Sequence, residues 1–119
     1  MKFLKYHCLG NDYLILITKN IELTNISLQP KMVRRICNRN FGLGADGILV
    51  GDFNKKNGLF SLHIYNSDGS LAEKSGNGLR IFARSLWDRQ IIGNKYIKIQ
   101  TLGGIVKAMV SSTDNNVIV

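Results

Sequence analysis

Apolar and polar residues alternate along the chain in short blocks, a pattern that predicts several strands. Residues 2–7 and 13–18 are apolar and partly β-branched or aromatic, and the turn-forming Gly10-Asn11-Asp12 separates them, so we predict two strands there. The same reasoning predicts further strands at 48–52, 59–65, 96–101, 105–112 and 116–119, with a hairpin around Leu102-Gly103-Gly104.

Two stretches have helical periodicity instead. The first is predicted to begin near Pro30, whose fixed φ suits a first helical turn, and to end at Gly42. The second is predicted from about Gly76 to Arg89, and its apolar stripe is broad enough for burial. Antiparallel strands around one central amphipathic helix predict an α+β fold.

Length and composition favour a single globular domain, residues 1–119. The hydrophobic content is 45%, and no apolar run approaches the ~20 residues that span a bilayer. The N-terminal segment is interrupted by Gly10 before it could act as a signal peptide. Two cysteines, Cys8 and Cys37, are too few for a disulfide scaffold and lack zinc-site spacing, so we expect a cytoplasmic protein without a metal site.

The net charge of +8 raises the possibility of nucleic-acid binding. Most basic residues are dispersed, and only Lys31, Arg34, Arg35 and Arg39 gather, on one predicted helix. Aromatic residues do not alternate with them as a base-stacking surface would require. A solvated helix face is the favoured interpretation, with nucleic-acid binding kept as the alternative.

The segment 42–47, GLGADG, matches the G-x-G-x-x-G pattern of dinucleotide-binding proteins. That site requires a strand before the glycines and a helix after them, so that the pyrophosphate meets helix amides. Here a helix is predicted before the segment and a strand after it. We therefore interpret it as a glycine-rich turn from helix to strand.

The segment Ser75-Gly76-Asn77-Gly78 lies where loop changes to helix. Glycines let backbone N–H groups approach a ligand closely, and a helix N-terminus carries about half a positive charge, so the segment could hold a carboxylate or phosphate. The alternative is that Ser75 or Asn77 simply caps the helix. Two glycines in a helix start favour the anion site, because glycine weakens a helix.

Three stretches, HCLGNDYLIL, FGLGADGILV and NSDGS…SGNGLRIFAR, occur in the order and spacing of the N-terminal half of diaminopimelate epimerase and its relatives. The chain resembles that family over essentially its whole length. The resemblance implies two similar α+β domains, each a curved mixed sheet wrapped around a central helix, with the active site between them. The chain would be the N-terminal domain, and the C-terminal domain would be missing.

The resemblance also implies chemistry without a cofactor, in which two cysteines remove and return the α-proton of an amino acid. It assigns Asn11, Asn66, Gly76 and Asn77 to substrate binding, and it places Ser75 at the position of the catalytic cysteine. Further differences from the family pattern are Gly47, where some members carry glutamine, and Cys8, at a usual glycine.

The favoured hypothesis is an epimerase or racemase paralogue with an altered site, of the type that converts LL- to meso-diaminopimelate in lysine and cell-wall biosynthesis. Its partners would be an amino acid with its carboxylate, the missing domain and possibly a second copy of the chain, with no membrane. We expect the 119-residue chain alone to be inactive, because inversion needs an acid and a base on opposite faces of one carbon. The alternative is a non-catalytic protein that binds amino acids or other carboxylates.

Overall fold

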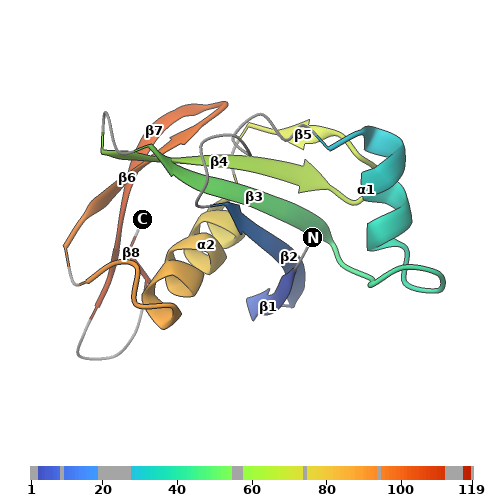
Figure 1. The fold of residues 1–119 in the computed structure, drawn as a ribbon, viewed down its shortest axis with the longest axis horizontal. Coiled ribbons are helices and arrows are strands. Elements are labelled where there is room, and N and C mark those ends of the chain that lie inside the picture. Colours follow the sequence, from blue (N-terminus) through green and yellow to red (C-terminus); the bar gives the residue numbers. More distant parts are fainter. Residues whose placement is uncertain are drawn as a thin grey trace.

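One curved sheet and two helices make up the fold (Figure 1). The computed structural model describes residues 3–8, 10–18, 28–54, 58–73, 75–93, 95–111 and 117–118 of the chain. The elements in chain order are β1 (Leu4–Cys8), β2 (Asn11–Thr18), α1 (Pro30–Cys37), β3 (Gly47–Asn54), β4 (Leu59–Asn66), β5 (Leu71–Ala72), α2 (Gly76–Asp88), β6 (Ile97–Thr101), β7 (Gly104–Val110) and β8 (Val117–Ile118).

The strands form a mixed sheet in the order β1-β2-β3-β4-β6-β7-β8, with β5 paired to β4. Two neighbouring pairs, β2 with β3 and β4 with β6, are parallel, and the other pairs are antiparallel. Parallel neighbours need a crossover connection, and α1 and α2 lie in the two crossovers. The predicted α+β class is confirmed, with two parallel pairs in the sheet.

Successive residues of a strand point to opposite faces of the sheet, and this alternation divides the core in two. Apolar residues on one face pack with α2, and those on the other pack with α1 (Figure 1). The alternating apolar residues of β4, Phe60, Leu62 and Ile64, belong to the α2 core. The other buried residues of that core include Tyr13, Ile15, Leu49, Leu79, Phe82, Leu86 and Ile99.

The second predicted helix is confirmed as α2, which ends at Asp88, one residue before the predicted end. Its Leu79, Phe82, Ala83 and Leu86 are buried with exposed fractions of at most 2%. Burial of a large apolar side chain such as Leu or Phe contributes about 2–3 kcal/mol to stability. Tertiary packing therefore stabilises α2 more than its intrinsic helix propensity does.

The prediction that Gly42 ends the first helix is wrong, because α1 ends at Cys37. The Asn38 side chain accepts hydrogen bonds from the amides of Asn40 and Phe41, which turns the chain away from the helix. The last helical carbonyls, of Ile36 and Cys37, accept from residues 44 and 45 instead. Side-chain capping therefore stops the helix before the glycine is reached.

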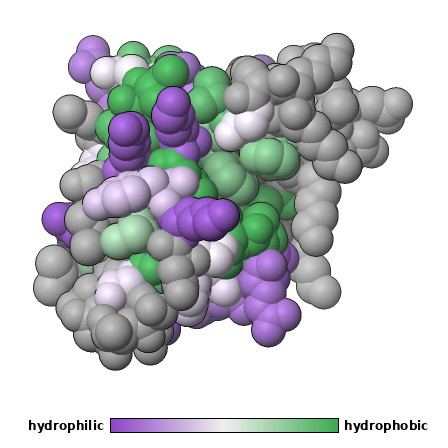
Figure 2. All heavy atoms as spheres, turned by 90° about the vertical axis from the view of Figure 1, so that its left-hand side faces the viewer, coloured by the Kyte–Doolittle hydropathy of each residue, from purple (hydrophilic) through white to green (hydrophobic). Residues whose placement is uncertain are grey.

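The predicted hairpin is present as β6 and β7, and the two-residue turn is Leu102-Gly103. Figure 2 shows this end of the molecule, where apolar and hydrophilic side chains lie side by side.

β5 was not predicted, and the predicted loop at 19–27 lies outside the described residues. None of the described helices has the length and apolarity of a membrane span.

Candidate functional site

The N-terminus of α2 is built on Ser75. Ser75 has an extended backbone, with φ −143° and ψ 125°, and its Oγ accepts a hydrogen bond from the Gly78 amide at 3.1 Å. The capping interpretation is therefore confirmed, and such a cap stabilises a helix by about 1 kcal/mol. Among the described residues, the amides of Gly76 and Asn77 have no hydrogen-bond acceptor. Two donors at the positive end of the helix dipole thus remain available to a ligand.

Gly78 allows the start of α2 to lie close to the sheet. A Cβ at this position would be 3.3 Å from Leu49 Cδ2 and 3.4 Å from Ser75 Oγ, both tighter than or at the limit of ordinary contact. The glycine that follows Asn77 is therefore explained by packing against β3.

Strand register places the other predicted site residues at the same end of the sheet. Gly47, the first residue of β3, pairs with Tyr13 on one side and with Asn66 on the other. Asn11 begins β2, two residues before Tyr13, and pairs with Cys8. The sheet therefore gathers these positions from three strands at the ends of β2, β3 and β4.

The structure does not join these asparagines directly to α2. The Asn66 side-chain amide donates to Ser70 Oγ at 3.0 Å within its own turn. In the described part of the chain, neither Asn11 nor Asn66 is hydrogen-bonded to Ser75, Gly76 or Asn77. Only a bound ligand could connect the two asparagines to the start of α2.

The side chain that does reach Ser75 is Tyr13, which sequence reasoning missed. Its hydroxyl lies 3.5 Å from Ser75 Oγ, across 62 residues of sequence. The ring is buried, with 7% of Tyr13 exposed, and it fills the space beside Gly47. A Cβ at Gly47 would be 2.8 Å from Tyr13 Cε1 and would collide with the Tyr65 carbonyl oxygen. An aromatic residue directly after Gly-Asn-Asp was the available signal.

Glu73 and Lys74 directly precede Ser75 in the chain and are the neighbouring titratable residues in sequence. Glu73 is exposed, and its recorded hydrogen bond is that of its carbonyl, which accepts from the Gly103 amide at 3.0 Å. Lys74 lies outside the described residues. Among the described residues, the titratable side chain in contact with Ser75 Oγ is the Tyr13 phenol, at 3.5 Å.

An ion cluster occupies the opposite face at the same end of the sheet. Arg39 donates to both carboxylate oxygens of Asp12, at 3.1 and 2.8 Å, and to Asp46 at 3.0 Å. Lys5 adds an ion pair to Asp12 at 3.4 Å. Hydrogen bonds from Arg39, together with the Asp46 amide and Lys5, hold the pKa of Asp12 well below its ordinary value. The Asp12 side chain is only 8% exposed, so this charge depends on its partners.

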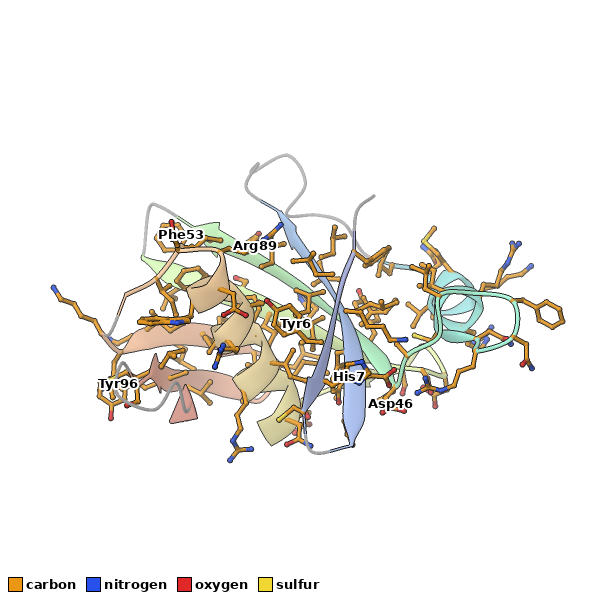
Figure 3. The ribbon with its side chains drawn as sticks, turned by 90° about the horizontal axis from the view of Figure 1, so that it is seen from below. Tyr6, His7, Asp46, Phe53, Arg89 and Tyr96 are labelled. Carbon is orange, nitrogen blue, oxygen red and sulfur yellow. The ribbon has the colours of Figure 1, made fainter. Side chains whose placement is uncertain are left out.

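The same cluster ties β2 to β3. The Asp12 amide donates to the Asp46 carboxylate, and the Asp46 amide donates to the Asp12 carbonyl and carboxylate oxygens. Asp46 lies near the end of the sheet closest to α1 (Figure 3). Of the four gathered basic residues, Arg39 is thus used within the fold, and Arg34 donates to the Asp68 carbonyl oxygen.

Tyr6 connects β1 to the far end of α2, as Figure 3 shows. Its hydroxyl donates to Asp88 at 2.8 Å. Burial first, and then the hydrogen bond to Asp88, raise the pKa of Tyr6 to about 12. Asp88 also accepts a hydrogen bond from Arg84 Nε at 3.0 Å within α2. The hydrogen bond from Tyr6 therefore fastens the C-terminal end of α2 to the sheet.

The curved sheet with α2 packed on one face is a fold that solved racemase and epimerase structures also have. A probable proline racemase from Agrobacterium radiobacter K84 superposes with a TM-score of 0.70 over 96% of this chain and 38% of that one, at 17% identity. A hydroxyproline epimerase from Agrobacterium vitis gives 0.68 over the same shares, at 18% identity. At these identities the likeness shows the fold.

Sequence comparison defines the family. The diaminopimelate epimerase family matches residues 3–119, and the chain belongs to it. It is 48% identical to diaminopimelate epimerase 2 of Nostoc sp. over 98% of its own length and 40% of that protein. It is 40% identical to diaminopimelate epimerase of Carboxydothermus hydrogenoformans, over 99% of this chain and 42% of the relative. The chain therefore spans about two fifths of the curated relatives it matches.

Proposed function

We propose that this chain supplies one half of the site of a cofactor-independent amino-acid epimerase or racemase related to diaminopimelate epimerase. Residues 1–119 would be its N-terminal domain, and a second domain would supply the other half. The chain's membership of the family and the racemase and epimerase fold support this proposal. Its substrate would be an amino acid, with diaminopimelate as the first candidate because the curated relatives carry that name.

The observation that carries the proposal is the start of α2. The amides of Gly76 and Asn77 have no acceptor among the described residues, and the positive end of the helix dipole adds to their field. A carboxylate held there would accept two backbone hydrogen bonds without any basic side chain. As the α-proton leaves, the same donors would stabilise the charge that spreads toward the carboxylate.

Ser75 would change the chemistry on this face of the substrate. A thiol of ordinary pKa ~8.5 can act as acid or base near neutrality, whereas a serine hydroxyl is a far weaker acid. Each unit by which the serine pKa exceeds that of a thiol adds ~1.4 kcal/mol to the cost of deprotonating the group at position 75. We therefore propose a paralogue with an altered site, in which any efficient base comes from the other half.

A protein that binds an amino acid without turnover is the second candidate. It is favoured by the Ser75 Oγ, which already serves as the helix cap and so is engaged in structure. Binding through the Gly76 and Asn77 amides would be retained in such a protein, because backbone donors do not depend on the residue at position 75.

The test is α-proton exchange in deuterated water, followed by mass spectrometry, on the protein purified with its native ends. LL-Diaminopimelate is the first substrate, within a panel of other amino acids. We expect slow exchange in the wild type and faster exchange in Ser75→Cys. If both proteins bind an amino acid and neither exchanges its α-proton, the result would support the second candidate, binding without turnover. Absence of binding as well would refute both.

A further inference from the structure

Tyr13 is held against Ser75 by the shape of the sheet. Its ring occupies the space that a side chain at Gly47 would need, and its hydroxyl lies 3.5 Å from Ser75 Oγ. A residue with a Cβ at position 47 would come within 2.8 Å of the ring. Gly47 and Tyr13 therefore act together, since the first makes room for the second.

Either hydroxyl could donate in this contact, and the hydrogen-bonding capacity of Ser75 favours one direction. A serine hydroxyl has one proton to donate and two lone pairs that accept. The Gly78 amide occupies one lone pair of Ser75 Oγ. In the described part of the chain, Ser75 Oγ is also the recorded partner of the Tyr13 hydroxyl. We take the phenol of buried Tyr13 as the donor, because its proton needs an acceptor and Ser75 has a second lone pair to accept it.

With both lone pairs engaged, Ser75 has only its own proton to offer. That proton would then be free for a ligand bound at the open amides of Gly76 and Asn77. A base needs a free lone pair, and in this arrangement Ser75 has none.

We propose that Tyr13 is a positioning residue that donates a hydrogen bond to the atom at position 75 and makes Ser75 a donor to the ligand rather than a base. The identity of the ligand as a carboxylate rests on the proposed function, whereas the Tyr13 donor does not. The register between β2 and β3 places Tyr13 beside Gly47.

The distance between the two oxygens indicates when this bond matters most. At 3.5 Å they lie beyond the ~2.7–2.8 Å of a fully formed O–H···O bond. Hydrogen bonds to ionised acceptors are shorter and about twice as strong as neutral ones. The sharpest test is therefore an ionisable atom at position 75.

The test introduces Ser75→Cys into the 119-residue chain, with and without Tyr13→Phe. The ionisation midpoint of the introduced thiol is measured from the pH dependence of iodoacetamide alkylation. Peptide mass spectrometry resolves the modified site, so that Cys8 and Cys37 do not contribute. Loss of the phenol proton should raise the midpoint by about one pH unit, which is about tenfold less thiolate near neutrality.

The matched control is Tyr96→Phe in the same Ser75→Cys background, because Tyr96 is 58% exposed and lies away from the β1–β2 pair in Figure 3. We expect no change of the midpoint there. An unchanged or lower midpoint in Tyr13→Phe would overturn the proposal. This readout requires no turnover, so it stands even if the protein proves to have no epimerase activity.

A second measurement covers the case in which Tyr13→Phe does not fold. Biosynthetic replacement of tyrosine by 3-fluorotyrosine keeps the ring and hydroxyl but makes the phenol a stronger donor. In the Ser75→Cys chain it should lower the thiol midpoint by several tenths of a pH unit, and the same lowering should be seen in the Tyr96→Phe control. A thiol midpoint that is the same with tyrosine and with 3-fluorotyrosine would contradict Tyr13 as the donor.

Discussion

Asp12 and Tyr13 are neighbours in sequence, yet they serve opposite faces of the sheet. Asp12 points toward the α1 side, where Arg39 binds both of its carboxylate oxygens and Lys5 and Asp46 complete a charge cluster. Tyr13 points toward the start of α2, where its hydroxyl has a single long contact to Ser75. Asp46 and Gly47 repeat the division one strand away, because Asp46 joins the cluster and Gly47 admits the Tyr13 ring.

This difference separates a structural site from a candidate functional one. In the cluster, each charge is matched by an opposite charge or an amide, so a ligand has little to add. At the α2 start, two described amides lack an acceptor and two hydroxyls are joined only at 3.5 Å. Groups that are incompletely satisfied in the free protein are the ones that a ligand can complete.

The largest effect is expected from breaking the cluster with Arg39→Met. Asp12 is 8% exposed and would keep only Lys5 and the Asp46 amide as partners. Leaving a buried carboxylate partly unpaired should lower the free energy of unfolding by about 3 kcal/mol. Urea unfolding at pH 7 measures it. The control is Arg35→Met on the exposed side of α1, which should change stability by less than about 0.5 kcal/mol.

Acid should remove the same contribution. The folded-state pKa of Asp12 lies below the ordinary value, so its stabilisation is present above about pH 4 and is lost as pH falls toward the folded pKa. The wild type should therefore lose more stability than Arg39→Met between pH 5 and pH 2.5, in urea unfolding at each pH. Parallel curves for the two proteins would show that Asp12 is not held by Arg39.

A second substitution, Gly47→Ala, tests the other face. The new Cβ would collide with the Tyr65 carbonyl oxygen and lie 2.8 Å from Tyr13 Cε1, so strand and ring must shift. Overpacking of this kind should cost about 2 kcal/mol in thermal or urea unfolding. Gly93→Ala is the control, since a Cβ there meets nothing within 4 Å. A neutral Gly47→Ala would mean that the ring has room to move away.

Ser75→Ala should have a smaller effect, because it removes one capping bond at the start of α2. Stability should fall by about 1 kcal/mol, and Ser75→Asn should restore most of it, since asparagine is also a good cap. Carboxylate binding, measured by calorimetry on the protein with native ends, should weaken by about one hydrogen bond, or ~1 kcal/mol. Complete loss of binding would show that the hydroxyl, rather than the helix amides, holds the ligand.

The smallest effect near neutrality is expected from Tyr6→Phe, which frees the far end of α2 from β1. The pKa of the Tyr6 phenol is raised to about 12 in the folded protein. The stabilisation by its hydrogen bond is therefore present below about pH 10 and is lost as pH rises toward 12. Stability at pH 7 should fall by less than about 1 kcal/mol. Between pH 9 and pH 11, the wild type should lose more stability than the variant. An identical pH dependence would contradict the bond to Asp88.

Local features were predictable where short-range physics decides them. The period of apolar residues located α2 and most of the strands, and the buried face of β4 followed from alternation at Phe60, Leu62 and Ile64. The position of Ser75 at the helix start also followed from sequence, because capping depends on the residue itself and on the next three. The end of α1 was predicted wrongly, because the Asn38 side chain binds the next amides and stops the helix before Gly42.

The sequence by itself determined the α+β class, the family and the segment that begins α2, because motif order and hydrophobic period are written along the chain. Only the tertiary structure decided that Tyr13 lies at Ser75 and that Asp12, one residue earlier, lies in a charge cluster. Both placements depend on β3 lying parallel to β2 in the register that pairs Gly47 with Tyr13. That register brings together residues 27 to 62 positions apart, and no local pattern in the chain encodes such distances.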